Sequence, residues 1–299
     1  KTKENLLITS IIFSKDRALQ LDLTLKTVAR NFDLCNDVIV IYKTSEMQYK
    51  ESYEKLKIEH PHVSFYEQSH SLFVDILGII SGSTSDCVCF FTDDNIVYRK
   101  VNMNKQEVKY AFDAQGSCIS LRIGTNTTQR DYGDGVFRND SIPQEVFSDP
   151  PFIVWNRTSI PTCGYWAYPL SVDGHIFKRE TMLEFCLELE FLNKLHSYRG
   201  VPREKSCWSQ TPNEFESKLQ RYYFDLPAPM FALEKSCVVN SPNNRVQSYA
   251  ENRSGDHFDY SASALNELYL SGKRLNVDNI DFTDIVCPHQ EIDILKGLE

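Results

Sequence analysis

Predicted strands and helices alternate through the first hundred residues of this chain, which is 299 residues long. Short continuous apolar runs are typical of strands buried on both faces, and apolar side chains spaced about three or four residues apart are typical of helices. The predicted strands and the helices between them cover, in chain order, residues 6–13, 18–32, 38–42, 47–60, 63–66, 72–80 and 88–91. This alternation predicts the α/β class, with a parallel sheet covered by helices on both faces.

The second part of the chain alternates less regularly. The expected helices cover residues 101–112, 181–195, 213–224 and 262–270, and the expected strands cover residues 119–123 and 170–177. The polar stretch 125–149 is expected to be rich in loops. Because no linker or internal repeat interrupts the chain, the sequence predicts one domain with two halves, residues 1–100 and residues 101–299.

The composition restricts the kind of protein that this chain can be. A formal net charge of −9 argues against a nucleic-acid-binding protein, because such proteins neutralise phosphates with Lys and Arg. No apolar run reaches the roughly 20 residues of a transmembrane segment, and no signal peptide is recognisable. The nine cysteines are an odd number without C-x-x-C pairs, so we expect reduced, buried thiols and a cytoplasmic location.

The most informative motif is Thr92-Asp93-Asp94-Asn95, which follows the predicted strand 88–91. Parallel α/β sheets bind ligands at the carboxyl ends of their strands. Two adjacent carboxylates repel each other unless a cation or hydrogen-bond donors compensate, and Mg²⁺ or Mn²⁺ suits oxygen ligands. The motif therefore predicts a metal site that holds a diphosphate, although an Asp-rich turn or a helix cap is also consistent with it.

Polar side chains also follow the first two predicted strands. Lys15 and Arg17 could neutralise phosphates, and Asp16 could accept a hydrogen bond from a base or a ribose. In an alternative interpretation, Ser14 or Asp16 caps the helix that begins near residue 18. Lys43 lies after the second strand, at the same predicted edge, and is a further candidate for nucleotide binding.

These features resemble the GT-A fold of glycosyltransferases, in particular the family 2 type. In that family the fourth strand ends in a DxD-like motif, to which TDDNI at residues 92–96 is similar. A polar loop that contacts the nucleotide follows the first strand, and residues 14–17 occupy that place. One departure is Asn95, which stands where a strict D-x-D motif has a carboxylate.

The resemblance implies a Rossmann-like fold with a mixed, mostly parallel central sheet and helices on both faces. It implies a metal-dependent glycosyltransferase of the hexosyltransferase class, which moves a sugar from a nucleotide-sugar donor, UDP-linked in our interpretation, to a glycan or another hydroxyl acceptor. Asp93 and Asp94 would bind Mn²⁺ or Mg²⁺ and the donor. Residues 1–100 would form the nucleotide-sugar-binding half, and residues 101–299 the acceptor-binding half with a C-terminal helical region.

Asp173 is the candidate catalytic base. Relatives place an acidic residue in an equivalent later segment, and an inverting transferase needs a carboxylate to take the proton of the acceptor hydroxyl. The pair Asp173-Gly174 is equally typical of a hairpin turn. We interpret the neighbouring His175 as a structural histidine.

Further candidates come from the second half. The candidates for an acceptor platform, on which a sugar ring could stack, are Trp155, Trp166 and Tyr168, although aromatic residues are more often part of a core. His289 is a candidate metal ligand because some GT-A enzymes use a late histidine, although a lone histidine is more often structural. Arg245, within the polar stretch 240–247, is a candidate for contacting the donor phosphates.

Two other functions remain open. A nucleotidyltransferase also uses a nucleotide-binding α/β domain, but a Gly-rich phosphate loop does not follow the first predicted strand. The other is a non-catalytic carbohydrate-binding or assembly protein on a degenerate GT-A scaffold, which would release no nucleoside diphosphate. The presence of both Asp93 and Asp94 weighs against it.

Overall fold

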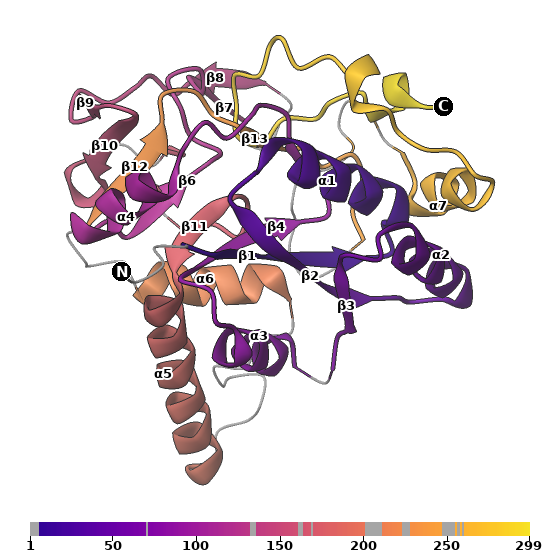
Figure 1. Ribbon diagram of the computed structural model, residues 1–299, viewed down its shortest axis with the longest axis horizontal. Helices are drawn as coiled ribbons and strands as arrows, with labels where there is room; N and C mark the ends of the chain where they lie inside the picture. Colours follow the sequence, from indigo (N-terminus) through magenta and orange to yellow (C-terminus); the bar gives the residue numbers. More distant parts are fainter. Residues whose placement is uncertain are drawn as a thin grey trace.

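The computed structural model describes residues 6–69, 71–131, 136–160, 164–168, 170–200, 211–222, 228–246, 255, 258 and 260–299. The strands of its largest sheet are β1 (Ile8–Lys15), β2 (Cys35–Lys43), β3 (Ser64–Glu67), β4 (Cys87–Thr92), β6 (Cys118–Ser120), β9 (Phe147–Asp149), β10 (Phe152–Asn156), β11 (His175–Lys178) and β12 (Pro229–Leu233). In the described residues they form a nine-stranded sheet in the order β3-β2-β1-β4-β11-β6-β12-β10-β9 (Figure 1). The strands of two smaller sheets are β5 (Asn95–Val97) with β13 (Val238–Asn240), and β7 (Gln129–Asp131) with β8 (Phe137–Asn139).

The large sheet is mixed, and most of its strands point the same way. β1 pairs in parallel with β2 and β4, β2 pairs in parallel with β3, and β12 pairs in parallel with β6. β11 is antiparallel to both of its neighbours, β4 and β6, and β10 is antiparallel to β12 and β9. Only β11 and β10 therefore run against the other strands of this sheet, and the predicted mixed, mostly parallel sheet is confirmed.

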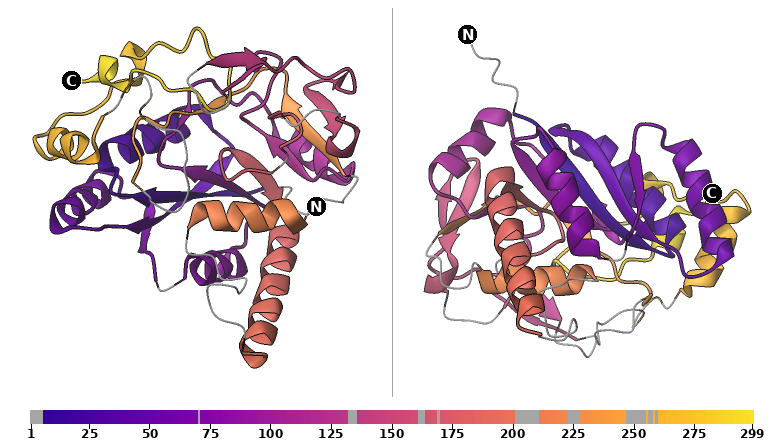
Figure 2. Two further views of the ribbon diagram at one scale, coloured as in Figure 1. Left: turned by 180° about the vertical axis from the view of Figure 1, so that it is seen from behind. Right: turned by 90° about the horizontal axis from the view of Figure 1, so that it is seen from below.

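Helices cover both faces of the large sheet (Figures 1 and 2). They are α1 (Ala18–Asn31), α2 (Met47–Glu59), α3 (Leu72–Gly82), α4 (Lys105–Asp113), α5 (Arg179–Tyr198), α6 (Pro212–Tyr222) and α7 (Ala262–Leu270), with short 3₁₀ helices at Arg157–Ser159, Val277–Asn279 and Ile294–Gly297. Side chains of α1, α2, α4 and α7 pack in one hydrophobic cluster, and those of α3, α5 and α6 pack in the other. Within the described ranges, no helix is long and apolar enough to cross a membrane.

Strand β4 explains why the first strands read as continuous apolar runs. Cys89 and Phe91 belong to the cluster of α1 and α2, whereas Val88 and Phe90 belong to the cluster of α3, α5 and α6. Successive side chains of a strand point to opposite faces, so a strand with helices on both sides needs apolar residues at every position. The predicted strand 88–91 is confirmed as part of β4.

The second half departs from the prediction in several places. The expected helix 101–112 starts only after Asn104, because Asn104 and Glu107 form a capping box that defines its first turn. The expected strand 170–177 is a loop as far as Gly174 and becomes β11 only after it. Gly174 has a φ of +74°, in the left-handed region that favours glycine, which ends the extended backbone.

Short strands were the most difficult elements to predict. The stretch 125–149, expected to be rich in loops, contains β7, β8 and β9, each of three residues. The five-residue strands β10 and β12 were not predicted. Their apolar residues follow one another without alternation, and a pattern of this length is shared by short helices and buried loops.

The described cysteines agree with the expectation of reduced, buried thiols. All seven of them are free, and six are buried. Cys87 and Cys89 lie on the same face of β4, in the cluster of α1 and α2. Burial raises the pKa of Cys87 to about 12, so this thiol stays protonated at neutral pH. Cys163 and Cys207 lie outside the described residues.

Phe90→Ala should destabilise the protein by about 3–5 kcal/mol, because its ring is fully buried against Phe13, Phe177 and Phe215 and would leave a cavity. The matched control is Phe191→Ala on α5, where the residue is 65% exposed and the change should be less than about 0.5 kcal/mol. Urea unfolding of the wild type and both variants measures the two differences. Equal losses would contradict the central position of β4.

Candidate functional site

The candidate site lies where β1 and β4 end side by side. Their last paired residues are Phe13 and Thr92, and the backbone N–H of Asp93 donates to the carbonyl of Phe13 at 3.0 Å. The loop after β1 and the motif after β4 therefore meet at one edge of the sheet. This agrees with the rule that parallel α/β sheets bind ligands at the carboxyl ends of their strands, here called the strand-end rule. Residues that follow β13 and residues that precede β11 complete the site.

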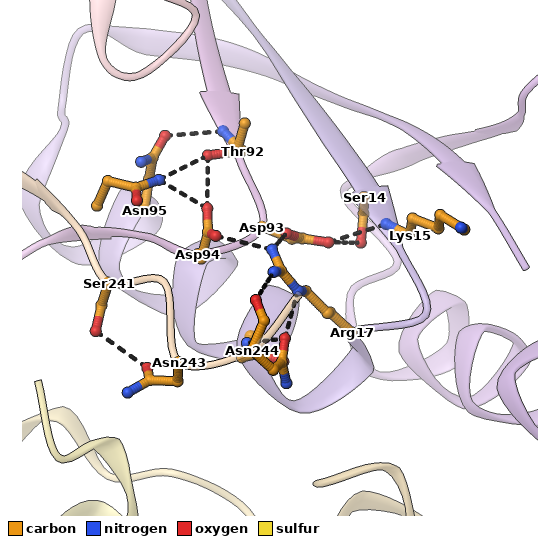
Figure 3. Close-up of polar contacts among 12 residues, drawn as sticks. Ser14, Lys15, Arg17, Thr92, Asp93, Asp94, Asn95, Ser241, Asn243 and Asn244 are labelled. Carbon is orange, nitrogen blue, oxygen red and sulfur yellow. Dashed lines mark hydrogen bonds and ion pairs between the residues drawn. The ribbon is translucent and has the colours of Figure 1, made fainter. Parts of the chain in front are cut away.

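Asp93 is held by the end of β1 and by Arg17, which follows this strand (Figure 3). Its Oδ2 accepts hydrogen bonds from the Ser14 hydroxyl at 2.8 Å and from the backbone N–H of Lys15 at 2.9 Å. Its Oδ1 accepts from Nη1 of Arg17 at 2.9 Å. Burial raises the pKa of Asp93 above its ordinary value, and the guanidinium of Arg17 opposes that shift.

Asp94 contacts both Arg17 and the last residue of β13. Its Oδ2 accepts from Nη1 of Arg17 at 2.8 Å. Its Oδ1 accepts from the Thr92 hydroxyl at 2.7 Å and from Nδ2 of Asn240 at 2.8 Å. The two carboxylates of the motif therefore share one guanidinium nitrogen, and each has its own further donors.

Arg17 occupies the place at which the sequence predicted a metal ion. Its side chain is 9% exposed and lies between the two carboxylates (Figure 3). Nε donates to Oδ1 of Asn244 at 2.7 Å, and Nη2 donates to the carbonyl oxygen of Asn244. Burial alone would lower the pKa of Arg17, but Asp93 and Asp94 raise it above its ordinary value, so the guanidinium stays charged.

The other residues of the loop after β1 hold the sheet edge. Arg17 is the N-cap residue of α1, and no side-chain hydrogen bond caps this helix, so capping by Ser14 or Asp16 is not found. Asp16 instead accepts from the backbone N–H of Ser45 at 2.8 Å and fixes the end of β2. Nζ of Lys15 donates to the carbonyl oxygen of Val246 at 2.6 Å.

The other two candidates for nucleotide binding, Lys43 and Arg245, have exposed side chains. The side chain of Lys43 is exposed, and its carbonyl oxygen accepts from the backbone N–H of Asp16 at 3.3 Å. Arg245 is exposed and follows Asn244, the partner of Arg17. Both therefore lie near the sheet edge, and their roles as donor contacts stay predictions.

Asp173 belongs to the same polar network. Its Oδ1 accepts from the Thr92 hydroxyl at 2.7 Å, from Nδ2 of Asn95 at 3.2 Å and from Nδ2 of Asn240 at 3.4 Å. Thr92 and Asn240 also contact Asp94, so the candidate base and the DxD-like motif are neighbours. A hydroxyl has one hydrogen, which means that Thr92 donates to only one of the two carboxylates at a time.

A buried arginine holds the other oxygen of Asp173. Nη1 of Arg122 lies 3.2 Å from Oδ2 of Asp173 and 2.7 Å from the Ser171 hydroxyl. Burial alone would raise the pKa of Asp173, but Arg122 and the hydrogen bonds from Thr92 and Asn95 lower it below its ordinary value. Asp173 is therefore ionised at neutral pH.

The residues next to Asp173 fix its backbone. The N–H of Gly174 donates to the carbonyl of Phe90 at 2.7 Å, and its carbonyl accepts from Leu121 at 2.8 Å. The pair Asp173-Gly174 thus leads the chain into the sheet. His175 is buried, and burial and Arg122 lower its pKa to about 3, so its imidazole is neutral; its structural role stays an interpretation.

Two of the three predicted platform residues are part of the core. Trp155 and Trp166 are fully buried, their rings pack edge to face 5.1 Å apart, and Nε1 of Trp155 donates to the carbonyl of Trp166 at 3.0 Å. The prediction that these indoles contact an acceptor is therefore corrected, because neither presents a ring face to a ligand. Tyr168 is 44% exposed and lies near Glu216 and Asp173.

The predicted metal ligands are not grouped around a common position. His289 forms a backbone bridge with Asn240, and its charge lowers the pKa of Asp173, so it lies at the edge of the network. Among the residues that the structure describes, no three His, Cys, Asp or Glu side chains could hold a metal ion together. Arg17 contacts both Asp93 and Asp94, and the expected metal-ligand set of Asp93, Asp94 and His289 stays a prediction.

Sequence reasoning missed several residues of the site. Arg122 follows a short apolar run, and a charged residue in that position could have indicated a buried ion pair. Asn240 and Asn244 belong to the polar stretch that was singled out only for Arg245. Glu216 is a half-buried acid of α6 whose Oε1 accepts from the backbone N–H of Val172 at 3.2 Å, and a helical pattern does not reveal it.

No family model and no curated protein matches this chain. Among solved structures, it is similar to 4-diphosphocytidyl-2C-methyl-D-erythritol synthase from Anaerococcus prevotii, with a TM-score of 0.38 and 12% identity over 78% of this chain and 90% of that one. It is also similar to the mannosyltransferase PcManGT from Pyrobaculum calidifontis in complex with GDP-Man and Mn²⁺ (TM-score 0.35, 12% identity, 58% and 44% of the two chains). A third is residues 1–349 of S. aureus TarS (TM-score 0.42, 10% identity, 78% and 59%). Likenesses this distant assign no donor, metal or residue role to the chain.

Proposed function

We propose that this chain is a glycosyltransferase that moves a sugar from a nucleotide-sugar donor to a hydroxyl of a glycan or a similar acceptor. The observation that supports this most directly is the connection between Asp173 and Asp94. Thr92 and Asn240 contact both carboxylates, so a candidate base lies beside the place proposed for the donor. A binding module does not require a base beside its ligand.

In the proposed reaction, the acceptor hydroxyl oxygen attacks the anomeric carbon while the bond from that carbon to the nucleoside diphosphate breaks. Asp173 takes the hydroxyl proton as the new glycosidic bond forms. The ionised state of Asp173, which Arg122 favours, suits this role. This single displacement inverts the configuration of the anomeric carbon.

Acceptor and sugar contacts are proposed for the residues around Asp173. The ring of Tyr168 is the one predicted platform residue that is partly exposed, and it lies next to Glu216. Oδ1 of Asn240 is buried and has no hydrogen-bond partner among the described residues. A ligand hydroxyl at this position would satisfy it, because buried polar atoms are normally paired.

The donor is proposed to bind along the loop after β1. Lys15 and Arg17 supply positive charge for the phosphates, and Asp16 supplies an acceptor for the base or the ribose. A uridine nucleotide is our proposal for the base. The carboxylates of Asp93 and Asp94, the expected ligands of Mn²⁺ or Mg²⁺, do not fit a metal ion as they stand, because Arg17 lies between them. No step of the proposed reaction is therefore routed through a metal.

The products distinguish the proposed function from its alternatives. A panel of nucleotide sugars, incubated with the protein and mixed glycan acceptors, should release one nucleoside diphosphate. Release of pyrophosphate from a nucleoside triphosphate would instead identify a nucleotidyltransferase. If nucleotide sugars bind but neither product forms with any acceptor, the chain is a binding module.

Asp173→Asn should slow the release of nucleoside diphosphate by about 10²–10⁴-fold, because the amide cannot take the acceptor proton. Donor affinity should change little, since Asp173 contacts the acceptor in this proposal. The matched control is Asp278→Asn, an exposed partner of Arg30, which should leave the rate unchanged. A similar rate in Asp173→Asn and the wild type would exclude this residue as the base.

Arg122→Gln should shift the acid limb of the pH–rate profile to higher pH. Arg122 lowers the pKa of Asp173, so removing the guanidinium raises that pKa. The base acts in its ionised form, and activity is lost as the pH falls through its pKa. Arg122→Lys keeps a positive charge and should shift the limb less. Identical profiles for all three proteins, measured from acid to neutral pH, would show that Arg122 does not act on the base.

A further inference from the structure

We infer that the side chain of Arg17, and not a divalent metal ion, is the cation that bridges the Asp93–Asp94 pair when the donor binds. The inference rests on the proposed function. Nη1 of Arg17 is 2.9 Å from Oδ1 of Asp93 and 2.8 Å from Oδ2 of Asp94 (Figure 3). One guanidinium nitrogen therefore bridges the two carboxylates, which are the groups that would hold a metal ion.

The charged side chains around this guanidinium have little access to solvent. The side chains of Asp93, Asp94 and Arg17 are 5%, 9% and 9% exposed. Mg²⁺ usually keeps several of its waters and needs near-octahedral oxygen geometry. A metal ion could bind the pair only after the guanidinium had left, and Arg17 is also held by two hydrogen bonds to Asn244.

The third position of the motif offers no carboxylate. Asn95 is fully buried, and both ends of its amide are used within the protein. Its Oδ1 accepts from the backbone N–H of Thr92 at 2.8 Å, and its Nδ2 donates to Asp173 at 3.2 Å. Asn95 is thus built into the turn after β4, and turning its oxygen toward a metal would leave the Thr92 N–H without this partner.

A second cation is in place for the diphosphate. The ammonium of Lys15 contacts the carbonyl oxygen of Val246 at 2.6 Å, which is a neutral acceptor. Its backbone N–H is anchored to Asp93 at 2.9 Å, so the side chain starts beside the carboxylate pair. With Arg17 bound to the aspartates, Lys15 adds further positive charge for the donor phosphates. Lys15 and Arg17 would then supply the positive charge that a bound metal supplies in a metal-dependent transferase.

The first test compares nucleotide binding with and without metal. Calorimetry with UDP, GDP, CDP, ADP and dTDP should identify one nucleotide that binds the wild-type protein with the same affinity in EDTA and in Mn²⁺. Binding only in Mn²⁺ would overturn the inference and leave the proposed transferase intact. If no nucleotide binds under either condition, the proposed function fails and the inference fails with it.

The second test removes the guanidinium. Arg17→Gln should weaken binding of that nucleotide by about tenfold or more in EDTA, because a charge-assisted contact is lost and two aspartates are left uncompensated. Arg17→Lys, which keeps the charge, should lose less. The matched control is Arg30→Gln on the same helix, whose side chain is 53% exposed and pairs with Asp278.

Mn²⁺ binding gives a readout that is independent of the nucleotide. Electron paramagnetic resonance should detect no Mn²⁺ bound to the wild type, whereas Arg17→Gln frees both carboxylates and should gain a site. Mn²⁺ should also raise the melting temperature of Arg17→Gln and not that of the wild type. A wild-type protein that binds Mn²⁺ and loses it in Asp94→Asn would overturn the inference. If Arg17→Gln does not fold, Arg17→Lys and the wild-type titrations still decide.

Discussion

The burial of Asp93 and Asp94 next to each other is the constraint on which the rest of this site depends. Two buried carboxylates are strongly destabilising unless a cation and hydrogen-bond donors compensate them. Arg17 provides the cation, and it is also bonded to Asn244, from which it is 227 residues distant in the chain. Compensation of the pair therefore brings together the ends of β1 and β4 and the segment after β13. The C-terminal part of the chain is held on the sheet edge by the same contacts.

A second guanidinium, that of Arg122, compensates the negative charge of Asp173 in the same network. Arg122 compensates Asp173 as Arg17 compensates the motif, so each acidic position has its own arginine from a different strand end. The Thr92 hydroxyl lies 2.7 Å from both Asp94 and Asp173, and its one hydrogen can serve only one of them. A ligand that changes the charge at Asp94 would therefore change the hydrogen bonding of the candidate base.

The first hundred residues could be predicted because each buried strand is a continuous apolar run, and the strand-end rule correctly placed Asp93 beside Ser14. The residues on the acceptor side could not be predicted from the sequence, as the following examples show. Trp155 and Trp166 resemble a sugar platform in sequence, but only their packing against each other reveals a core. Arg122 and Asn240 act through partners far away in the chain, and a single sequence does not specify such pairs. The motif indicated that a cation or hydrogen-bond donors were needed, and we predicted a divalent metal ion, although the repulsion between two carboxylates does not distinguish a metal ion from a guanidinium.

That ambiguity has a physical basis. A pair of carboxylates attracts any cation. The cation that binds is the one that loses the least free energy when it gives up its other contacts. A guanidinium attached two residues after β1 is always present at the pair and presents planar donors that suit carboxylates. A metal ion must displace it, so its apparent affinity falls in proportion to the fraction of molecules in which Arg17 has left. A carboxylate at position 95 would favour the metal, and the asparagine that stands there instead, tied to Thr92 and Asp173, favours the arginine.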